Sequence, residues 1–404
     1  MKILMVAPYI YNKSFDPKMR NVSGLGIIIN NLCEGLSRNN TIDLFVPRAS
    51  KSLRVGNIKL IQHSLLNVAM QFRPYLNNEF LYVLKNSNIT FKRKMKAFFY
   101  ILETVIFRRV LNKKTHDVTV IHGAFYRSYL LAKECTRLGQ CFVLVLHGTI
   151  YKDEVSGDIL DKKSEEQLAE LVKNTDNKII VISSGIKKDL INKYNLNPDS
   201  IIVIPNGIQK PIINSNVEEI KNKYKIGCSK VVLYIGNISV NKNQKLLIDS
   251  ARNILSKMDV CFIFAGKNDA KLNLHNYVEE LGLDSNVVFT GFLETKAIHE
   301  LLSIADLTVL LSYSEGFGLS IVEGYSFGVP SLFPADFDAK QELYDENCAF
   351  LVSERSVSEV SSAVLFALNN RWDKEKIKIY SNNFTIIEMV KKYENFLNSI
   401  ICKG

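Results

Sequence analysis

The segment 312–330 holds the residues whose types and spacing are best suited to chemistry. It reads SYSEGFGLSIVEGYSFGVP, with Glu315 and Glu323 eight positions apart and Gly316 and Gly318 between them. A carboxylate only accepts hydrogen bonds, which suits it to bind the hydroxyl groups of a sugar or a ribose. Glycines at a turn before a helix let backbone amides approach an anion such as a phosphate. The segment therefore predicts half of an active site. The competing interpretation is that Glu315 caps a helix and Glu323 is merely solvated.

The neighbouring residues predict how this segment is held. The apolar run from Leu307 to Leu311 is typical of a buried strand bounded by polar groups. A helix is expected to begin near Leu319 and to end at Gly328 and Pro330. Both carboxylates would then face the space above the carboxyl end of the strand.

Strand-like and helix-like segments alternate along the chain, which is typical of βαβ units and a mainly parallel sheet. Such sheets bind ligands at the carboxyl ends of their strands. Because 404 residues exceed what one hydrophobic core usually supports, we predict two domains. A second cycle of βαβ begins at Val231. The expected strands of the first half are 3–7, 42–46, 118–121, 142–146 and 179–182, with a helix at 24–37.

Further candidates follow the expected strands of the first half. His147 comes directly after the strand 142–146, and His122, a weaker candidate, stands in a similar place after 118–121. A lone histidine is usually structural, but a strand-end position favours a functional role. Gly24 and Gly26 open the first long helix and could contact a diphosphate, although an ordinary strand-to-helix turn explains them about as well. The Gly-x-Gly-x-x-Gly spacing of a dinucleotide site is absent, which argues against an oxidoreductase.

The segment from Glu315 to Glu323 resembles the signature of the retaining glycosyltransferases of family 4. In that family the first Glu and the Phe-Gly-Leu backbone contact the donor sugar. The resemblance implies this role for Glu315, Phe317, Gly318 and Leu319. The second Glu of the family holds the ribose of the nucleotide, which implies a ribose contact for Glu323.

The segment 236–248 resembles the family's Gly-Arg-Leu…Lys segment, whose Arg and Lys neutralise the donor diphosphate. Lys242 occupies the Lys position, but Asn237 stands where the family has Arg. Asparagine offers neutral dipoles in place of a permanent planar charge. Neutralisation would then rest on Lys242, on helix amides and on Lys18 or Arg20 in the first loop.

The resemblance covers nearly the whole chain and implies an α/β protein of the GT-B type, with two Rossmann-like lobes facing across a cleft. His147 matches a family histidine near the donor sugar and phosphate, and would lie on the lobe opposite Glu315. We predict an N-terminal acceptor-binding lobe at 1–208, a linker at 209–228, a nucleotide-sugar lobe at 229–383 and a helix returning to the first lobe at 384–404.

The implied activity is transfer of a sugar from a UDP- or GDP-linked donor to a glycan or lipid-linked acceptor, with retention at the anomeric carbon. The resemblance implies no metal and no cofactor, because cationic groups can serve the diphosphate instead. Synthesis of a surface polysaccharide or glycolipid is the expected setting. Two other classes stay open: a nucleotide-sugar epimerase of the same architecture, and a non-catalytic partner subunit, which Asn237 would favour.

Charge is distributed unevenly along the chain. The net charge is +10, yet residues 1–210 hold 31 Lys and Arg against 17 Asp and Glu, and the remainder holds 20 against 24. Such asymmetry indicates that one domain meets an anionic partner. Basic residues surround aromatic ones between 91 and 114, which favours either an anionic membrane surface or a helix packed on its own domain. No recognisable nucleic-acid motif accompanies them, so we expect no nucleic-acid partner.

Composition and cysteines indicate the compartment. No run of about 18 apolar residues occurs, and no signal-peptide cleavage site follows the first strand. Seven cysteines, an odd number without Cys-x-x-Cys spacing, argue against a disulfide framework and a zinc site. We therefore expect a reducing, cytoplasmic setting, peripheral at the inner face of the cell membrane if 91–114 contacts lipid.

Overall fold

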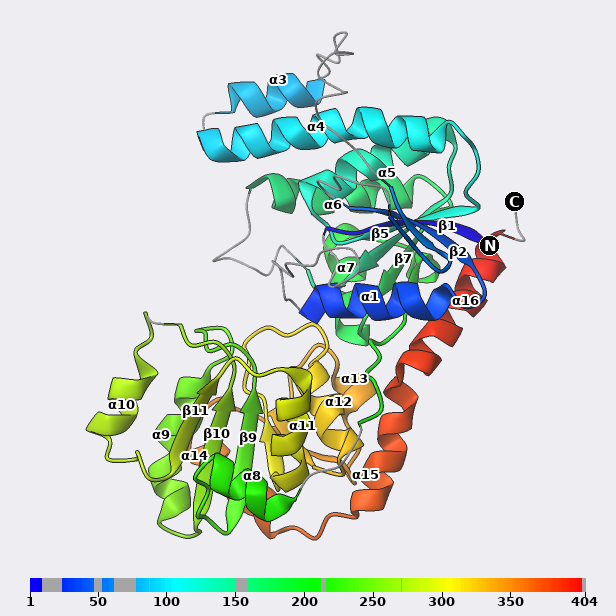
Figure 1. Cartoon of the computed structure of the whole chain (residues 1–404). Coiled ribbons are helices and arrows are strands. Elements are labelled where there is room, and N and C mark those ends of the chain that lie inside the picture. Colours follow the sequence, from blue (N-terminus) through cyan, green and yellow to red (C-terminus); the bar gives the residue numbers. More distant parts are fainter. Residues whose placement is uncertain are drawn as a thin grey trace. The chain divides into compact units, whose positions relative to one another are not determined.

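A computed structural model of the chain describes residues 1–8, 24–46, 53–61, 78–86, 88–149, 159–211, 216–269 and 271–401. The chain divides into two compact α/β units (Figure 1). Unit 1 comprises Met1–Ile182, Ile186–Pro205 and Met389–Gly404, and unit 2 comprises Ser183–Gly185 and Asn206–Glu388. Each unit has its own mainly parallel sheet, so the predicted α/β class with two Rossmann-like units is confirmed.

Unit 1 is built on a sheet with the strand order β3-β4-β2-β1-β5-β6-β7-β8. All neighbours are parallel except β3 and β4, which form an antiparallel pair at one edge. The central strands β5 and β6 are buried along their whole length, as expected for apolar strands covered on both faces. The strands are β1 (Lys2–Val6), β2 (Thr41–Phe45), β3 (Leu53–Val55), β4 (Ile58–Leu60), β5 (Val118–His122), β6 (Phe142–Leu146), β7 (Lys178–Val181) and β8 (Ile201–Val203).

Helices connect these strands, and the C-terminal helix joins them. They are α1 (Gly24–Leu36), α3 (Asn78–Lys85), α4 (Phe91–Leu111), α5 (Tyr126–Leu138), α6 (Ile159–Lys173), α7 (Ser184–Tyr194) and α16 (Ile386–Ile401), with the short η1 (Pro198–Ser200) before β8. From Met389 onward α16 belongs to unit 1. It packs so closely on α1 that a Cβ atom at Gly35 would lie 2.3 Å from Val390 Cγ2. Glu394 also accepts a 2.9 Å hydrogen bond from Asn40.

Unit 2 has the parallel strand order β11-β10-β9-β12-β13-β14. Helices α8 and α11 pack together on one face of this sheet, and α9 and α14 pack together on the other (Figure 1). The strands are β9 (Lys230–Ile235), β10 (Val260–Ala265), β11 (Val287–Gly291), β12 (Leu307–Val309), β13 (Ser331–Pro334) and β14 (Ala349–Val352). The helices are α8 (Val217–Lys223), α9 (Gln244–Leu255), α10 (Leu274–Glu280), α11 (Thr295–Ile304), α12 (Leu319–Ser326), α13 (Lys340–Leu343), α14 (Val357–Asn369), α15 (Lys374–Ser381) and η2 (Asn382–Phe384).

The segment 216–228, which we predicted to be part of a linker, is a structural part of unit 2. Asn216 caps α8 by accepting a hydrogen bond from the backbone amide of Glu218. Ile220 and Ile226 are buried in the core beside β9 and α11. The polar composition that indicated a linker is the solvent-facing side of this helix.

One cysteine pair departs from the expectation drawn from the cysteines, which argued against a disulfide framework. Cys228 and Cys261 form a disulfide, with their Cα atoms 5.5 Å apart. Cys228 precedes β9, and Cys261 is paired with Val231 across β9 and β10. The prediction from spacing was wrong because parallel pairing brings together residues that are 33 positions apart. Four other cysteines of the described chain are free thiols: Cys33, Cys135, Cys141 and Cys348.

None of the helices that the structure describes combines the length and apolar composition required to cross a membrane.

Candidate functional site

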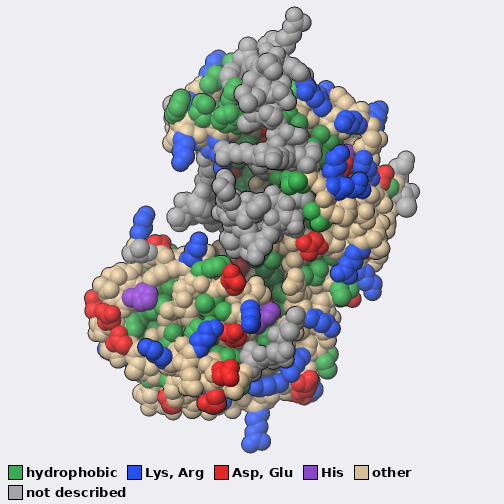
Figure 2. Space-filling view, viewed as in Figure 1, with side chains coloured by type: hydrophobic (Ala, Val, Ile, Leu, Met, Phe, Trp, Pro, Cys, Tyr) green, Lys and Arg blue, Asp and Glu red, His purple; other side chains and the backbone are tan. Residues whose placement is uncertain are grey.

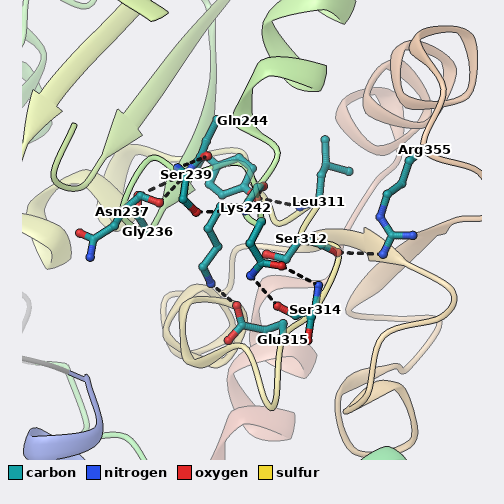
Figure 3. Close-up of polar contacts among 12 residues, drawn as sticks. Gly236, Asn237, Ser239, Lys242, Gln244, Leu311, Ser312, Ser314, Glu315 and Arg355 are labelled. Atoms are coloured by element: carbon teal, nitrogen blue, oxygen red, sulfur yellow. Dashed lines mark hydrogen bonds and ion pairs between the residues drawn. The ribbon is translucent and has the colours of Figure 1, made fainter. Parts of the chain in front are cut away.

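Two loops meet at the carboxyl ends of β9 and β12, which are neighbours in the sheet of unit 2 (Figure 3). The side chain of Asn241 joins them: its Nδ2 donates to the carbonyl of Ser314 at 2.8 Å, and its Oδ1 accepts from the amide of Ser314 at 3.0 Å. The amide of Tyr313 donates to the carbonyl of Asn241 at 2.8 Å. Three hydrogen bonds thus hold the loop that carries Glu315 against the loop that carries Lys242.

Lys242 and Glu315, both predicted site residues, form an ion pair across these loops (Figure 3). Their side chains are 24% and 20% exposed, so the pair lies at the surface of the site without being fully solvated. The buried Tyr234 fixes the backbone around it, because its hydroxyl donates to the carbonyl of Lys242 and accepts from the amide of Leu311 at 2.9 Å. A phosphate and a sugar hydroxyl could engage the ammonium and the carboxylate respectively.

The predicted turn before α12 has the geometry that glycine permits. Gly318 precedes the helix with φ of 78°, and a Cβ atom there would lie 2.8 Å from the ring of Phe337. Phe317 is buried, with its ring 5.9 Å from that of Phe384, so only its backbone is suited to a ligand. The first amides of the helix, beginning at Leu319, have no partner within the helix and carry the positive end of its dipole.

Glu323 lies on α12, in the second turn after Leu319, and is half-buried. Burial raises the pKa of its carboxyl group to about 7. The group therefore changes charge near neutral pH, and a ligand that donates hydrogen bonds to it would favour the ionised form.

Asn237, at the position where the family has Arg, makes hydrogen bonds that hold the local backbone. Its carbonyl accepts a 3.1 Å hydrogen bond from Gln244 (Figure 3). Its Oδ1 accepts another of 3.1 Å from the amide of Lys267. The backbone is crowded here, since a Cβ atom at Gly266 would lie 2.1 Å from the carbonyl oxygen of Gly236. Asn237 thus joins the ends of β9 and β10.

In unit 1, His122 and His147 meet at the carboxyl ends of neighbouring strands. His122 ends β5 and His147 follows β6. His122 Nδ1 lies 3.1 Å from His147 Nε2, and the two ring planes are inclined by only 18° with their centroids 5.4 Å apart. Burial lowers the pKa of His147 to about 4, and burial together with the neighbouring His147 holds the pKa of His122 well below its usual value. Both rings are therefore neutral imidazoles near neutral pH.

The glycines predicted to bind the diphosphate begin α1. Gly24 is its first residue, with no atom of the described residues within 4 Å of where a Cβ would stand, and Gly26 is buried. Lys18 and Arg20, the other basic candidates, lie outside the described residues. Within unit 2, the structure brings together Lys242, Glu315 and the backbone from Phe317 to Leu319. Within unit 1, it brings together the two histidines.

Sequence reasoning missed several residues that shape the unit 2 site. Arg355 donates to the carbonyl of Ser312 at 2.8 Å and binds Asp336 with two hydrogen bonds of 2.8 Å each. It anchors the start of the loop that carries Glu315 (Figure 3). No signal marks Arg355 in the sequence. Asn241 stands beside other asparagines and Tyr234 in an apolar strand, so composition does not distinguish them either.

Family models match both parts of the chain. The model described as "Glycosyl transferases group 1" matches residues 216–384, and that described as "Glycosyltransferase Family 4" matches residues 22–210. Together they extend over unit 2 and over most of unit 1. The predicted resemblance is therefore confirmed by comparison with whole domains as well as by the signature around Glu315.

Curated relatives and solved structures agree with this assignment. The uncharacterized glycosyltransferase MJ1607 of Methanocaldococcus jannaschii is 26% identical over 208 residues, which are 50% of this chain and 50% of the relative. The O-antigen biosynthesis glycosyltransferase WclY of Escherichia coli is 28% identical over 166 residues, 41% of this chain and 45% of the relative. The chain thus spans half or less of the length of these curated relatives.

The crystal structure of HepE from Anabaena, in complex with UDP and glucose, has a TM-score of 0.67 and 18% identity. The match covers 99% of this chain and 100% of that one, and at this identity it shows a shared fold. With the signature, the two family models and the fold in agreement, the chain belongs to the GT-B glycosyltransferases of group 1 and family 4.

Proposed function

We propose that this protein transfers a sugar from a nucleotide-sugar donor to a hydroxyl group of a glycan or lipid-linked acceptor. The observation that carries the proposal is the ion pair of Lys242 and Glu315 on the loops that lead to α9 and α12. This arrangement supplies a cation for a diphosphate, a carboxylate for sugar hydroxyls and helix amides for an oxyanion. Membership of the glycosyltransferase family gives the reaction class.

The reaction requires charge to be stabilised on the leaving group. When the bond between the anomeric carbon and the phosphate oxygen breaks, negative charge collects on the diphosphate. Lys242 and the amides of Gly318 and Leu319 stabilise that charge, which lowers the barrier, and no metal is required for this. Glu315 accepts a hydrogen bond from the sugar and orients its ring.

We infer that the configuration at the anomeric carbon is retained. The acceptor oxygen bonds to the face of the sugar from which the phosphate departs, and the acceptor proton passes to the leaving phosphate oxygen. The support for this step is the resemblance of the segment from Glu315 to Glu323 to retaining enzymes. Product analysis by NMR of the anomeric proton would decide it.

The comparisons guide the choice of substrates. HepE was crystallised with UDP and glucose, so UDP-linked hexoses are the first donors to test, followed by GDP-linked ones. WclY is named for O-antigen biosynthesis, which supports a surface polysaccharide or glycolipid as the product. A cytoplasmic place of synthesis is part of the same proposal. No cofactor is part of this proposal, since the nucleotide-sugar is a co-substrate.

The proposal is tested with a panel of UDP- and GDP-sugars and a lipid extract from the host. We expect nucleotide release that depends on the acceptor, and a Glu315→Gln variant about 10-fold to 100-fold slower, because one charged hydrogen bond is lost. The matched control is Glu300→Gln, which breaks a surface ion pair with Lys223 in the same unit and should leave the rate unchanged. Absence of both turnover and nucleotide binding would refute the proposal that the protein is a glycosyltransferase enzyme.

The neutral side chain of Asn237 supports one alternative hypothesis, that the protein is a non-catalytic partner subunit. The family has a charged Arg at this position for the diphosphate. Here the side chain is neutral and accepts a hydrogen bond from the amide of Lys267. A partner subunit would bind no nucleotide with measurable affinity, whereas the transferase would bind UDP or GDP. An epimerase would turn over the donor without any acceptor. Calorimetric titration with UDP and GDP, followed by the acceptor-dependence assay, separates the three.

We also propose that unit 1 meets an anionic membrane surface, through only part of the segment 91–114. The second half of α4 is packed: Phe107 is buried with its ring 5.1 Å from that of Phe45. Glu103 is also buried and accepts two hydrogen bonds from Arg127. Arg108 is likewise bound to Glu134. The core-helix interpretation therefore describes this half.

The first half of α4 and the end of α3 expose large apolar side chains instead. Phe91, Met95 and Phe99 recur every four residues, so they share one helix face, and they are 80%, 41% and 40% exposed. Leu81 and Leu84 of α3 are 39% and 49% exposed. We call these five residues the α3–α4 face. In Figure 2 hydrophobic side chains gather over the α3 and α4 end of unit 1, beside basic ones.

The charges beside the α3–α4 face indicate its partner. Lys85, Lys92 and Lys96 are exposed next to it, and attraction to anionic lipid contributes about 1 kcal/mol for each basic group near the surface. Arg93 is not available, because it pairs with Asp161 at 2.8 Å. Apolar residues that enter the interface, flanked by lysines that bind headgroups, fit a peripheral membrane contact.

Vesicle binding tests this contact. Changing both Lys92 and Lys96 to Gln should weaken binding to phosphatidylglycerol-containing vesicles about 30-fold, the equivalent of about 2 kcal/mol. Lys374→Gln with Lys376→Gln on α15 of unit 2 is the matched control, and Phe366→Ser, where the side chain is 53% exposed, controls for a Phe91→Ser variant. Equal binding of all variants would return the whole of α4 to the core-helix interpretation.

A further inference from the structure

A chain of three side chains ends at the candidate site of unit 1. Met5 on β1, His122 on β5 and His147 after β6 come from three neighbouring strands. His122 Nε2 lies 3.1 Å from Met5 Sδ, and His122 Nδ1 lies 3.1 Å from His147 Nε2. His122 is only 1% exposed, so water does not compete for these contacts. His147 Nδ1 is buried and has no hydrogen-bond partner among the described residues.

Counting protons determines which nitrogen carries each hydrogen. Two neutral imidazoles hold one N–H each, and a thioether sulfur has lone pairs but no hydrogen to donate. If His122 Nε2 carried no hydrogen, its lone pair would face those of Met5 Sδ at 3.1 Å, which is repulsive. His122 therefore carries its hydrogen on Nε2, and its Nδ1 is an acceptor. The hydrogen between the two rings must then belong to His147 Nε2.

We propose that Met5 and His122 hold His147 as its Nε2–H tautomer, so that His147 Nδ1 accepts a hydrogen bond from a sugar hydroxyl. The assignment of the donor as a sugar hydroxyl rests on the proposed function and makes that function more specific. A bare lone pair accepts from hydroxyl groups and repels phosphate or carbonyl oxygens, which offer only lone pairs themselves.

The neutral state that this count requires agrees with the surroundings of the rings. Burial lowers the pKa of both histidines, so neither gains a second hydrogen near neutral pH. Met5 and His122 act through His147 and are positioning residues. The bond that a histidine makes with one nitrogen sets the role of the other, as in metal sites and proton relays.

Nitrogen NMR of the protein labelled with ¹³C,¹⁵N-histidine reads the tautomer directly. The six histidines make the spectrum simple, and a His147→Gln variant assigns the signals. We expect His147 Nε2 to resonate as a protonated, pyrrole-type nitrogen and Nδ1 as an unprotonated, pyridine-type nitrogen. A protonated Nδ1, or an average of both forms, in the folded wild-type protein would overturn the proposal.

Two variants test the cause. Met5→Leu removes the sulfur at nearly constant volume, and His122→Phe removes the acceptor for His147 Nε2. Each should shift His147 toward a mixture of tautomers, whereas Met258→Leu in unit 2 should leave it unchanged. A pure Nε2–H form in folded Met5→Leu and His122→Phe would show that other groups set the tautomer. The wild-type spectrum decides the tautomer itself even if neither variant folds.

Ligand titration tests the hydroxyl. UDP is compared with UDP-glucose, and GDP with GDP-mannose. In whichever pair binds, the sugar-bearing member should shift the Nδ1 resonance and the free nucleotide should not. An equal shift from the free nucleotide, or no shift from the bound sugar nucleotide, would overturn the hydroxyl assignment. If no member of either pair binds, the proposed function fails while the tautomer measurement stands by itself.

Discussion

The candidate sites of the two units differ in the charge of their side chains. In unit 2, Lys242 and Glu315 keep full charges and hold them as an ion pair at the edge of solvent. In unit 1, His122 is buried and His147 is half-buried, and desolvation lowers the pKa of both rings, which keeps them neutral. Both sites lie at the carboxyl ends of parallel strands, so topology does not explain the difference. The types of the side chains explain it, together with the burial of His122, which is only 1% exposed.

This difference indicates which ligand group each site suits. In a pre-formed ion pair the cation is already in place and partly solvated. A diphosphate can therefore pair with it without a large desolvation cost. A neutral imidazole with one free lone pair offers nothing to a diphosphate but can accept from a hydroxyl. Unit 2 is thus suited to a charged ligand group, and unit 1 to an uncharged group that donates a hydrogen bond.

Removing the ammonium group of Lys242 should have the largest effect on the rate of transfer. Lys242→Ala is expected to lower kcat about 100-fold to 1000-fold, the usual cost of deleting a group that stabilises charge on the leaving oxygen. It also leaves the carboxylate of Glu315 without its partner. Initial rates with a saturating donor measure the effect.

The control for Lys242→Ala is Lys223→Ala, which breaks an ion pair of 2.6 Å with Glu300 elsewhere in unit 2. This pair is exposed on the lysine side, and such pairs contribute little to stability. We expect an unchanged rate. A Lys242→Ala enzyme as fast as this control would remove the ion pair from the mechanism.

The sequence was sufficient for the parts of unit 2 that depend on local pattern. The apolar run before Ser312 predicted β12, and the glycines predicted the turn at Gly318 with its positive φ. The signature around Glu315 and the separate resemblance of segment 236–248 predicted Glu315 and Lys242 as site residues, and the fold brings these two side chains into contact. Each of these features is determined by residues close together in the chain or by a motif.

Features that depend on distant residues could not be predicted. Arg355 reaches the carbonyl of Ser312 across 43 positions, and Met5 reaches His122 across 117. Nothing in the local composition marks either contact. For the basic segment 91–114 the sequence left two interpretations open for another reason. Helix α4 has apolar residues on more than one face, so periodicity did not separate its packed half from its exposed half.

Glu323 is an intermediate case, a carboxyl group that titrates near neutral pH. Glu323→Gln should weaken nucleotide binding about 10-fold at pH 8, where the wild-type group is ionised and can accept from ribose hydroxyls. Because its pKa is about 7, wild-type affinity should fall toward that of the variant as the pH drops below this value. Calorimetric titration with UDP or GDP between pH 5.5 and 8.5, values chosen to span about 1.5 units on either side of that pKa, measures this.

Stability of the unliganded protein should respond with the opposite sign. The pKa of Glu323 is raised from 4.5 to about 7 in the folded state, so its contribution is fully present below 4.5 and is lost as the pH rises through 7. The advantage of Glu323→Gln in thermal unfolding should therefore grow between these values and stay constant above them. A pH-independent difference in both stability and affinity would place Glu323 outside the ribose site.

Asn237 allows the smallest but most specific test of charge in unit 2. Asn237→Arg adds the cation that the family has, at an exposed position, which should strengthen UDP or GDP binding by up to about 5-fold, or about 1 kcal/mol. It also removes the hydrogen bond to the amide of Lys267, so thermal stability should fall slightly. Asn237→Ala loses the same bond without adding charge and is the matched control. If both variants bind nucleotide equally well, the diphosphate does not approach this position, and Lys242 with the helix amides is the whole of the neutralising group in unit 2.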